Sequence, residues 1–239
     1  MPATRRRPRA ALARTCAHIA TLLLLGTGAT LGDSGDFERM RALAAERYGA
    51  EGASAVSAWE DTVARGRVAD GNARLELVNA FFNDRVIFGD DEEIWRQRDY
   101  WATPLETLGR GRGDCEDFSV AKYVTLRLLG VPDARLRLVY VKAAIGGPRS
   151  RVTQAHMVVA YYPADDAEPL ILDNLVPRVL PASRRPDLTP VFSFNAEGLW
   201  VGSRPEVADK QPERRLSHWR GVLERMRREG LRQESGSGR

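Results

Sequence analysis

Cysteine and histidine are scarce in this chain of 239 residues, which contains two cysteines and three histidines. Cys16 and His18 lie in an N-terminal segment that we expect to be removed, so that Cys115, His156 and His218 remain. A lone cysteine cannot form an internal disulfide, and this excludes a fold stabilised by disulfide bonds. In an oxidising compartment a free thiol is a liability, so Cys115 is a candidate reactive residue.

A long hydrophobic run is also missing. Residues 1–32 contain five arginines and no acidic residue, and their apolar stretch from Ile19 to about Leu31 is short. A membrane span needs about 20 apolar residues, whereas a basic start followed by a short apolar run is typical of a secretory signal. We therefore expect residues 1–32 to be a signal peptide, or an uncleaved N-terminal anchor, because no clean A-x-A cleavage site follows.

A strong excess of charge is missing once this segment is set aside. The formal net charge of the whole chain is +4, and loss of the five arginines would change it to −1. Proteins that bind nucleic acid usually carry a basic surface. We therefore expect no nucleic-acid partner.

The pattern of apolar residues changes from helical to alternating near residue 135. Helical spacing predicts helices over 37–49, 54–66, 70–82 and 115–129, with a loop over 84–113. Alternation then predicts strands over 136–142, 152–162, 169–175, 191–194 and 199–203, followed by a basic helix over about 210–232. Since no repeat or long linker divides the chain, we expect one α+β domain over 33–232 and a disordered tail over 233–239.

Three carboxylates surround the cysteine in GRGRGDCEDFSVAKY, residues 109–123. Asp114 suits the N-cap of a helix, and Asp117 mimics the acidic member of a capping box, so Cys115 would begin that helix. The backbone N–H groups and dipole at a helix start favour a thiolate and can stabilise an oxyanion. Gln97 is a chemically able second oxyanion donor, although nothing in the sequence places it there.

A cysteine nucleophile also needs a base, and His156 lies in a predicted strand whereas His218 lies in the basic helix. If His156 pairs directly with Asp173 of the next strand, a four-residue hairpin loop remains and the two side chains share a face. Asp173 could then orient His156 toward Cys115, as a catalytic triad requires. Each residue alone also fits a structural role, as a small core cysteine, a satisfied strand histidine or a turn aspartate. Because the three occur together, we favour the catalytic interpretation.

Several blocks of the sequence resemble the LapG-like bacterial transglutaminase-like cysteine proteinases. These blocks are VNAFFND (78–84), DYWATPLETL (99–108), GDCEDFSVAKY (113–123), AHMVVAYY (155–162), LILDNL (170–175) and PVFSFNAEGLW (190–200). The resemblance implies a transglutaminase-like, papain-like fold in which a catalytic helix packs on an antiparallel sheet. It also implies a periplasmic location and Cys115, His156 and Asp173 as the triad.

The three carboxylates also allow a metal interpretation. They could pair with Arg110 and Arg112, but oxygen ligands without further cysteine or histidine suit calcium better than zinc. Their spacing is not that of an EF-hand loop. The resemblance implies calcium dependence, with Asp114 and Glu116 as the best ligands and Asp117 next.

The resemblance further implies an endopeptidase that cleaves a large surface adhesin near its N-terminus and so controls biofilm attachment. An inner-membrane receptor that sequesters the protease would be its regulatory partner. Two alternatives stay open from the residues themselves. One is a transglutaminase or amidase that uses the same triad, and the other is a non-enzymatic binding module on the same fold.

Two further features have a structural and a functional interpretation. Trp95, Tyr100 and Trp101 could line a substrate cleft, but we favour packing in the core beneath a long loop. The helix over 210–232 could contact a membrane or an acidic partner. Its apolar side predicts a helix docked on the surface of the domain.

Overall fold

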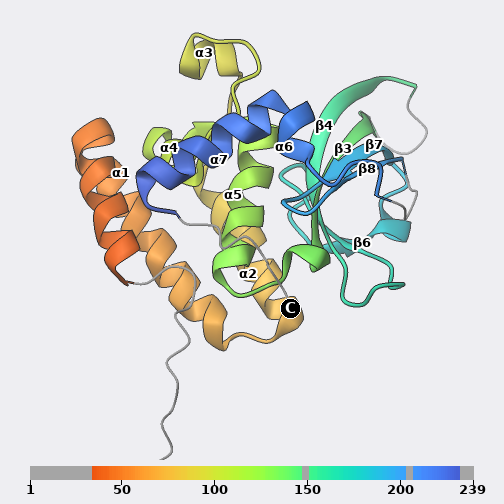
Figure 1. Cartoon of the computed structure of the whole chain (residues 1–239), viewed down its shortest axis with the longest axis horizontal. Coiled ribbons are helices and arrows are strands. Elements are labelled where there is room, and N and C mark those ends of the chain that lie inside the picture. Colours follow the sequence, from red (N-terminus) through yellow and green to blue (C-terminus); the bar gives the residue numbers. More distant parts are fainter. Residues whose placement is uncertain (1–33, 147–150, 203–206, 232–239) are drawn as a thin grey trace, which may run out of the picture.

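The computed structural model describes residues 34–146, 151–202 and 207–231. Most of its helices lie on one side of a six-stranded antiparallel sheet, so the α+β class is confirmed (Figure 1). The predicted signal segment 1–32 and the predicted tail 233–239 lie outside the described residues. Within the described residues, no helix combines the length and hydropathy needed to cross a membrane.

The first two predicted helices form one element, α1, over Ser34–Val68. Gly49 interrupts it with φ 73° and ψ −164°, a conformation that glycine reaches easily. The prediction that Gly49 ends the first helical segment is therefore confirmed, but the second segment follows it directly and does not wait until residue 54. The next helix, α2, covers Gly71–Arg85, and its predicted cap is confirmed, because the side chain of Asp70 accepts a hydrogen bond from the N–H of Ala73.

The predicted loop over 84–113 was wrong in part, because it contains four short elements. They are β1 (Ile87–Phe88), α3 (Asp91–Trp95), α4 (Pro104–Arg110) and β2 (Arg112–Gly113). Helix α4 has a full capping box between Thr103 and Glu106, with Pro104 in its first turn. Elements this short are stabilised by caps and tertiary contacts, which the spacing of apolar residues does not reveal.

Helix α5, Cys115–Leu128, lies at the centre of the molecule between the other helices and the sheet (Figure 1). It packs on β3 and β4 and also contacts α2 and α4. The indole N–H of Trp59 on α1 donates to the hydroxyl of Thr125, with 2.8 Å between the two atoms. These buried contacts fix the helix that carries the candidate nucleophile.

The sheet has the strand order β6-β5-β4-β3-β7-β8. Its strands are β3 (Leu136–Ala144), β4 (Thr153–Tyr161), β5 (Leu170–Leu172), β6 (Leu180–Pro181), β7 (Leu188–Phe194) and β8 (Leu199–Val201). Two 3₁₀ turns, Asp133–Arg135 and Ala182–Arg184, precede β3 and β7. Strand β5 is shorter than the predicted 169–175, because it ends just before Asp173.

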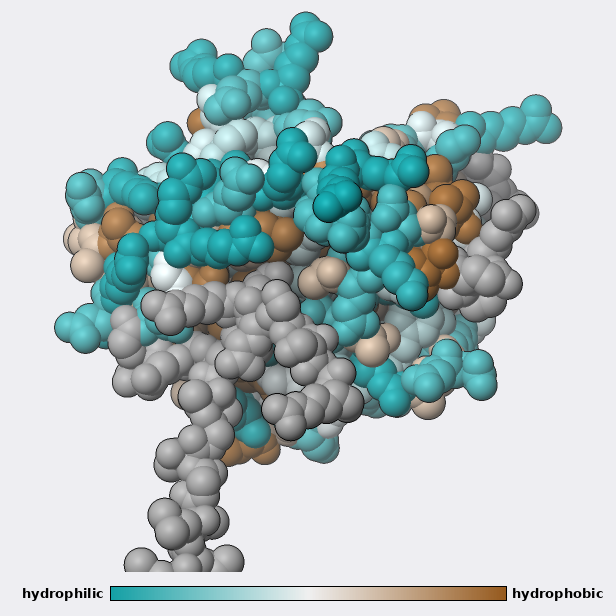
Figure 2. Space-filling model, viewed as in Figure 1, coloured by the Kyte–Doolittle hydropathy of each residue, from teal (hydrophilic) through white to brown (hydrophobic). Residues whose placement is uncertain are grey.

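The predicted basic helix over 210–232 is divided at Leu216 into α6 (Pro212–Arg215) and α7 (Ser217–Glu229). Trp219, Val222 and Met226 of α7 are buried. The surface along α7 is mainly hydrophilic in the same view (Figure 2). The docked surface helix is therefore confirmed as the structural role of this segment.

Among Trp95, Tyr100 and Trp101, the core interpretation is confirmed for Trp101, whereas Trp95 and Tyr100 are half-buried and lie outside the hydrophobic core. Trp101 is buried and stacks on Phe194 with their ring centroids 5.8 Å apart. Tyr100 is half-buried and its hydroxyl donates to Glu106. Trp95 packs on Tyr100 with a centroid separation of 4.7 Å.

Candidate active site and acidic cluster

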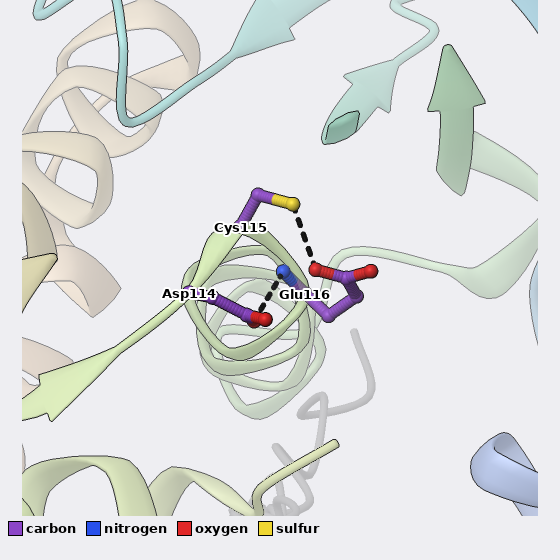
Figure 3. Close-up of side chains that lie close together, drawn as sticks. All are labelled: Asp114, Cys115 and Glu116. Carbon is purple, nitrogen blue, oxygen red and sulfur yellow. Dashed lines mark hydrogen bonds between the residues drawn. The ribbon is translucent and has the colours of Figure 1, made fainter. Parts of the chain in front are cut away.

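Cys115 is the first residue of α5, where the sequence predicted it. Asp114 is the N-cap, and the capping box between Asp114 and Asp117 is complete. The thiol is 9% exposed, and its Sγ donates to Oε2 of Glu116 at 2.7 Å (Figure 3). The side chain of Asp114 accepts from the backbone N–H of Glu116 in the same view. The helix start is thus built from the carboxylates that flank the thiol.

The first turn of α5 docks on strand β4 at Met157. The hydroxyl of Ser119 donates to the carbonyl oxygen of Met157 at 2.9 Å. The backbone of Met157 also lies close enough to Cys115 to oppose the rise in the pKa of its thiol. Cys115 and Ser119 are one helical turn apart, so both lie on the face of α5 that meets the strand. This docking places the thiol beside the residue that directly follows His156.

His156 and Asp173 are in contact, as predicted, although the strand register is not the predicted one. Nε2 of His156 lies 2.8 Å from Oδ1 of Asp173, and both side chains are about 1% exposed. The strands pair Val159 with Leu172, so His156 is not directly opposite Asp173 and the register differs by two residues. A shift of two keeps both side chains on one face, because strand side chains alternate with a period of two.

The carboxylate of Asp173 receives several hydrogen bonds. His156 and the backbone N–H of Leu175 donate to Oδ1, and Arg185 donates to Oδ2 at 2.7 Å. Burial alone raises the pKa of Asp173, but these hydrogen bonds and the charge of His156 lower it to about 2. Asp173 is therefore an anion at neutral pH, and its Oδ1 forms a hydrogen bond with Nε2 of His156. The other ring nitrogen, Nδ1, remains for the thiol.

The two other candidates from the sequence lie elsewhere. His218 is on α7, its ring is 5.6 Å from that of Trp101, and its Nε2 is 3.6 Å from Oδ2 of Asp99. Gln97 is exposed in the segment that follows α3. The geometry therefore favours His156 over His218 as the base and gives Gln97 no support as an oxyanion donor.

A fourth carboxylate, Asp91, joins the acidic residues at the start of α5. Oxygen atoms of Asp91, Asp114 and Asp117 lie within 4.8 Å of one another, and Asp114 also forms such a group with Cys115 and Glu116. The pairing of β1 with β2 brings Asp91 there, since the N–H of Gly89 donates to the carbonyl oxygen of Gly113. Sequence reasoning missed Asp91, because the two strands that bring it there are two residues long and their paired positions are 25 residues apart, which leaves no local signal.

Gly113 is required for this close packing. A Cβ at this position would lie 2.7 Å from Oδ2 of Asp117, which is too close for a real contact. Asp117 is fully buried, and its two oxygens accept from the backbone N–H groups of Ala102 and Asp114. Asp117 therefore ties α5 to the segment before α4 in addition to facing the other carboxylates.

The carboxylates at the helix start destabilise one another's charged forms. Burial, followed by the charges of Glu116 and Asp117, raises the pKa of Asp114 to about 9. Burial also raises the pKa of Asp91 to about 6, although a hydrogen bond from Tyr100 opposes the rise. Burial and then the charge of Glu116 raise the pKa of the Cys115 thiol well above its ordinary value. Without a cation the cluster therefore favours protonated carboxyl groups, and the same burial and negative neighbours oppose ionisation of a thiol that must ionise to react.

The donor set fits a hard cation. Oδ1 of Asp91 is buried and has no hydrogen-bond partner among the described residues. Arg112 pairs with Glu93 at 3.0 Å, and Arg110 lies over the rings of Tyr48 and Trp95. The pairing of these arginines with the cluster, which the sequence allowed, is therefore not found. Asp91, Asp114, Glu116 and Asp117 could hold an oxygen-seeking divalent ion.

This geometry agrees with the relatives of the chain. A family model described as bacterial transglutaminase-like cysteine proteinase (BTLCP) matches residues 51–187. The chain belongs to this family. The resemblance seen in the sequence is thereby confirmed, and the chain is a member of a cysteine peptidase family. Among curated proteins no significant match is found.

Solved structures of LapG from Legionella pneumophila share the fold of this BTLCP member. The EGTA-treated LapG is 38% identical, with a TM-score of 0.68, and the match covers 80% of this chain and 97% of that chain. A calcium-bound LapG is 37% identical, with a TM-score of 0.67 and coverage of 80% and 98%. The predicted transglutaminase-like fold is therefore confirmed.

Proposed function

We propose that this BTLCP member is a calcium-dependent cysteine endopeptidase of the periplasm, with Cys115 as nucleophile, His156 as general base and Asp173 as the acid that orients His156. The observation that carries this proposal is the contact between His156 and Asp173. It lies next to Met157, the residue of β4 on which the first turn of α5 docks. Membership of a cysteine proteinase family supports the same three roles.

The proposed chemistry follows from the atoms that remain free. Nδ1 of His156 accepts the thiol proton, and the sulfur attacks the peptide carbonyl to form an acyl-enzyme. The imidazolium then gives its proton to the leaving amine, and His156 next activates the water that releases the acid product. The anionic Asp173 stabilises the imidazolium and keeps the ring in the orientation that each step needs.

Calcium is the ion that we assign to the acidic cluster. LapG from Legionella pneumophila has been solved in a calcium-bound form, and the cluster in this chain offers the oxygen ligands that calcium prefers. Bound calcium would supply positive charge that offsets the carboxylates around Cys115. We infer that Asp91 belongs with Asp114, Glu116 and Asp117 in the ligand set.

The proposed substrate is a large surface adhesin cleaved near its N-terminus, and the proposed regulator is an inner-membrane receptor that sequesters the protease. Both follow from the family resemblance and from the predicted export of the chain. The test is to incubate the purified chain, with calcium, with the large surface proteins of its host. We expect one such protein to be shortened and released, whereas Cys115→Ala protein should release none. If enzyme whose Cys115 reacts readily with iodoacetamide leaves the surface proteins intact, this substrate assignment is contradicted.

The same assay separates hydrolysis from acyl transfer. A labelled primary amine is added during the incubation, and its incorporation into protein is measured. An endopeptidase should give shortened fragments with little label, because water resolves the acyl-enzyme. Label on full-length proteins would instead indicate a transglutaminase.

The choice of base is tested by the two histidines. His156→Ala is expected to lower the turnover by about 10³-fold or more, because the thiol loses its proton acceptor. His218→Ala is the matched control and should keep near wild-type turnover, since His218 is half-exposed and contacts Trp101 and Asp99. The rates of peptide cleavage decide between the two histidines. An inactive His218→Ala enzyme together with an active His156→Ala enzyme would disprove the triad.

A further inference from the structure

We propose that Arg185 is a positioning residue for the triad, which fixes the carboxylate of Asp173 so that its other oxygen faces His156. This inference rests on the proposed function, and it adds a residue that lies outside the triad and the acidic cluster. Arg185 follows the 3₁₀ turn Ala182–Arg184 and is 4% exposed. Its Nη2 donates to Oδ2 of Asp173, while Oδ1 of Asp173 is bound by His156.

The guanidinium of Arg185 is itself held in place. Its Nε donates to Oδ1 of Asp187 at 3.0 Å, and its Nη2 donates to Oδ2 of Asp187 at 2.8 Å. Two parallel bonds of this kind fix the plane of the guanidinium. The orientation therefore passes from Asp187 through Arg185 to Asp173 and then to the ring of His156.

The backbone of Asp173 is held by a separate set of contacts. Asn83 on α2 donates from Nδ2 to the carbonyl oxygen of Asp173 at 2.8 Å. Oδ1 of Asn83 accepts from Nζ of the buried Lys122 on α5 at 2.7 Å. Because the main chain of Asp173 has its own support, the contact with Arg185 acts on the rotation of the carboxylate. Loss of Arg185 should loosen that rotation without releasing the strand end, because the carboxylate would then be held through Oδ1 alone, by Leu175 and His156.

Stability alone is a poor reason for this arginine. Its Nη1 is buried and has no hydrogen-bond partner among the described residues. Burying a charged group with an unsatisfied donor costs free energy, and a buried ion pair often adds little net stability. The cost is better explained by the orientation of the acid that contacts the base.

Arg184 and Arg185 provide a matched pair for the test, because Arg184 is the exposed neighbour. The first readout is the rate at which iodoacetamide alkylates Cys115 at one neutral pH with calcium present, which needs no protein substrate. The second is the tautomer of His156, read from ¹⁵N shifts of labelled histidine and assigned by loss of the signals in His156→Ala protein. We expect wild type to carry its proton on Nε2, which leaves Nδ1 free to accept from the thiol.

Arg185→Gln should slow alkylation by between ~10-fold and ~100-fold, since small misplacements of catalytic groups cost about this much. It should also mix the two tautomers of His156. Arg185→Lys should recover part of the rate by keeping the charge, and Arg184→Gln should match wild type. If Arg185→Gln does not fold, Asp187→Asn releases the same guanidinium from a half-buried position and should shift both readouts in the same direction.

A folded Arg185→Gln protein with wild-type alkylation and a single Nε2–H tautomer would overturn the role of Arg185 alone. Slow alkylation of wild-type Cys115 in calcium would instead overturn the proposed triad, and the role of Arg185 with it. Failure to cleave an adhesin would affect neither readout. The outcomes therefore separate this inference from the proposed function.

Discussion

Replacing Cys115 with alanine is expected to abolish peptide cleavage and to leave the fold intact. The change removes one sulfur atom at the start of α5 and, with it, the proposed nucleophile. Loss of the nucleophile in a triad enzyme lowers turnover on the order of 10⁶-fold. Cys115→Ser should be almost as inactive, because a hydroxyl is far less acidic than a thiol. Cleavage of a surface protein or peptide, measured against background hydrolysis, checks this result.

The other cysteine provides the control. Cys16 lies in the predicted signal segment, so Cys16→Ala should keep full activity and the same alkylation by iodoacetamide. The thermal midpoint of Cys115→Ala should stay near that of wild type, since the change removes only one sulfur atom and leaves a small void. Turnover by Cys115→Ala comparable to wild type would remove Cys115 from the mechanism, whatever its position in the fold.

The position of Cys115 could be predicted from the sequence because the signal is local. Asp114 and Asp117 form a capping box on either side of it, and the structure shows both of its hydrogen bonds. Such a motif depends on residues only three positions apart. The helix start, and the carboxylates around the thiol, therefore follow from a short stretch of sequence.

The pairing of His156 with Asp173 was predicted for a partly wrong reason. A four-residue loop was expected, but Tyr161 pairs with Leu170, so eight residues separate the paired positions. The length of the hairpin loop was predicted wrongly, because a polar loop can hold extra residues without a change in the strands that it joins. The predicted contact between His156 and Asp173 is nevertheless present, because a register shift of two residues keeps both side chains on the same face of the sheet.

Asp91 and Arg185 could not be found in this way, because distant segments bring them to the site. Asp91 reaches the cluster through the pairing of β1 with β2, and Arg185 reaches Asp173 from a turn near the edge of the sheet. Neither residue lies in a helix or strand with a clear period. Their roles depend on tertiary contacts, which local patterns do not specify.

Removing calcium is expected to suppress both activity and thermal stability. Without the ion, the carboxyl groups of Asp91, Asp114, Glu116 and Asp117 repel one another's charges and tend to take up protons. The pKa of the neighbouring thiol is then raised by burial and by Glu116. A chelator should therefore slow peptide cleavage, and added calcium should restore it better than magnesium, which keeps its own waters and demands tighter geometry. Calcium at 100 times its dissociation constant should stabilise the fold by about 2.7 kcal/mol.

Asp91 and its neighbour Asp90 test which carboxylates hold the ion. Asp91 is buried with a free Oδ1, whereas Asp90 is the exposed N-cap of α3 and makes no side-chain cap hydrogen bond. Asp91→Asn should therefore weaken calcium binding measured by calorimetry and should reduce the calcium-dependent rise in thermal midpoint. Asp90→Asn should leave both near wild type. Because calcium competes with protons for these carboxylates, binding should also weaken as the pH is lowered. Full activity in chelator, with no calcium heat at millimolar concentration, would contradict the calcium site and leave the cluster with structural roles, as the cap of α5 and as acceptors for the backbone N–H groups of Tyr100 and Ala102.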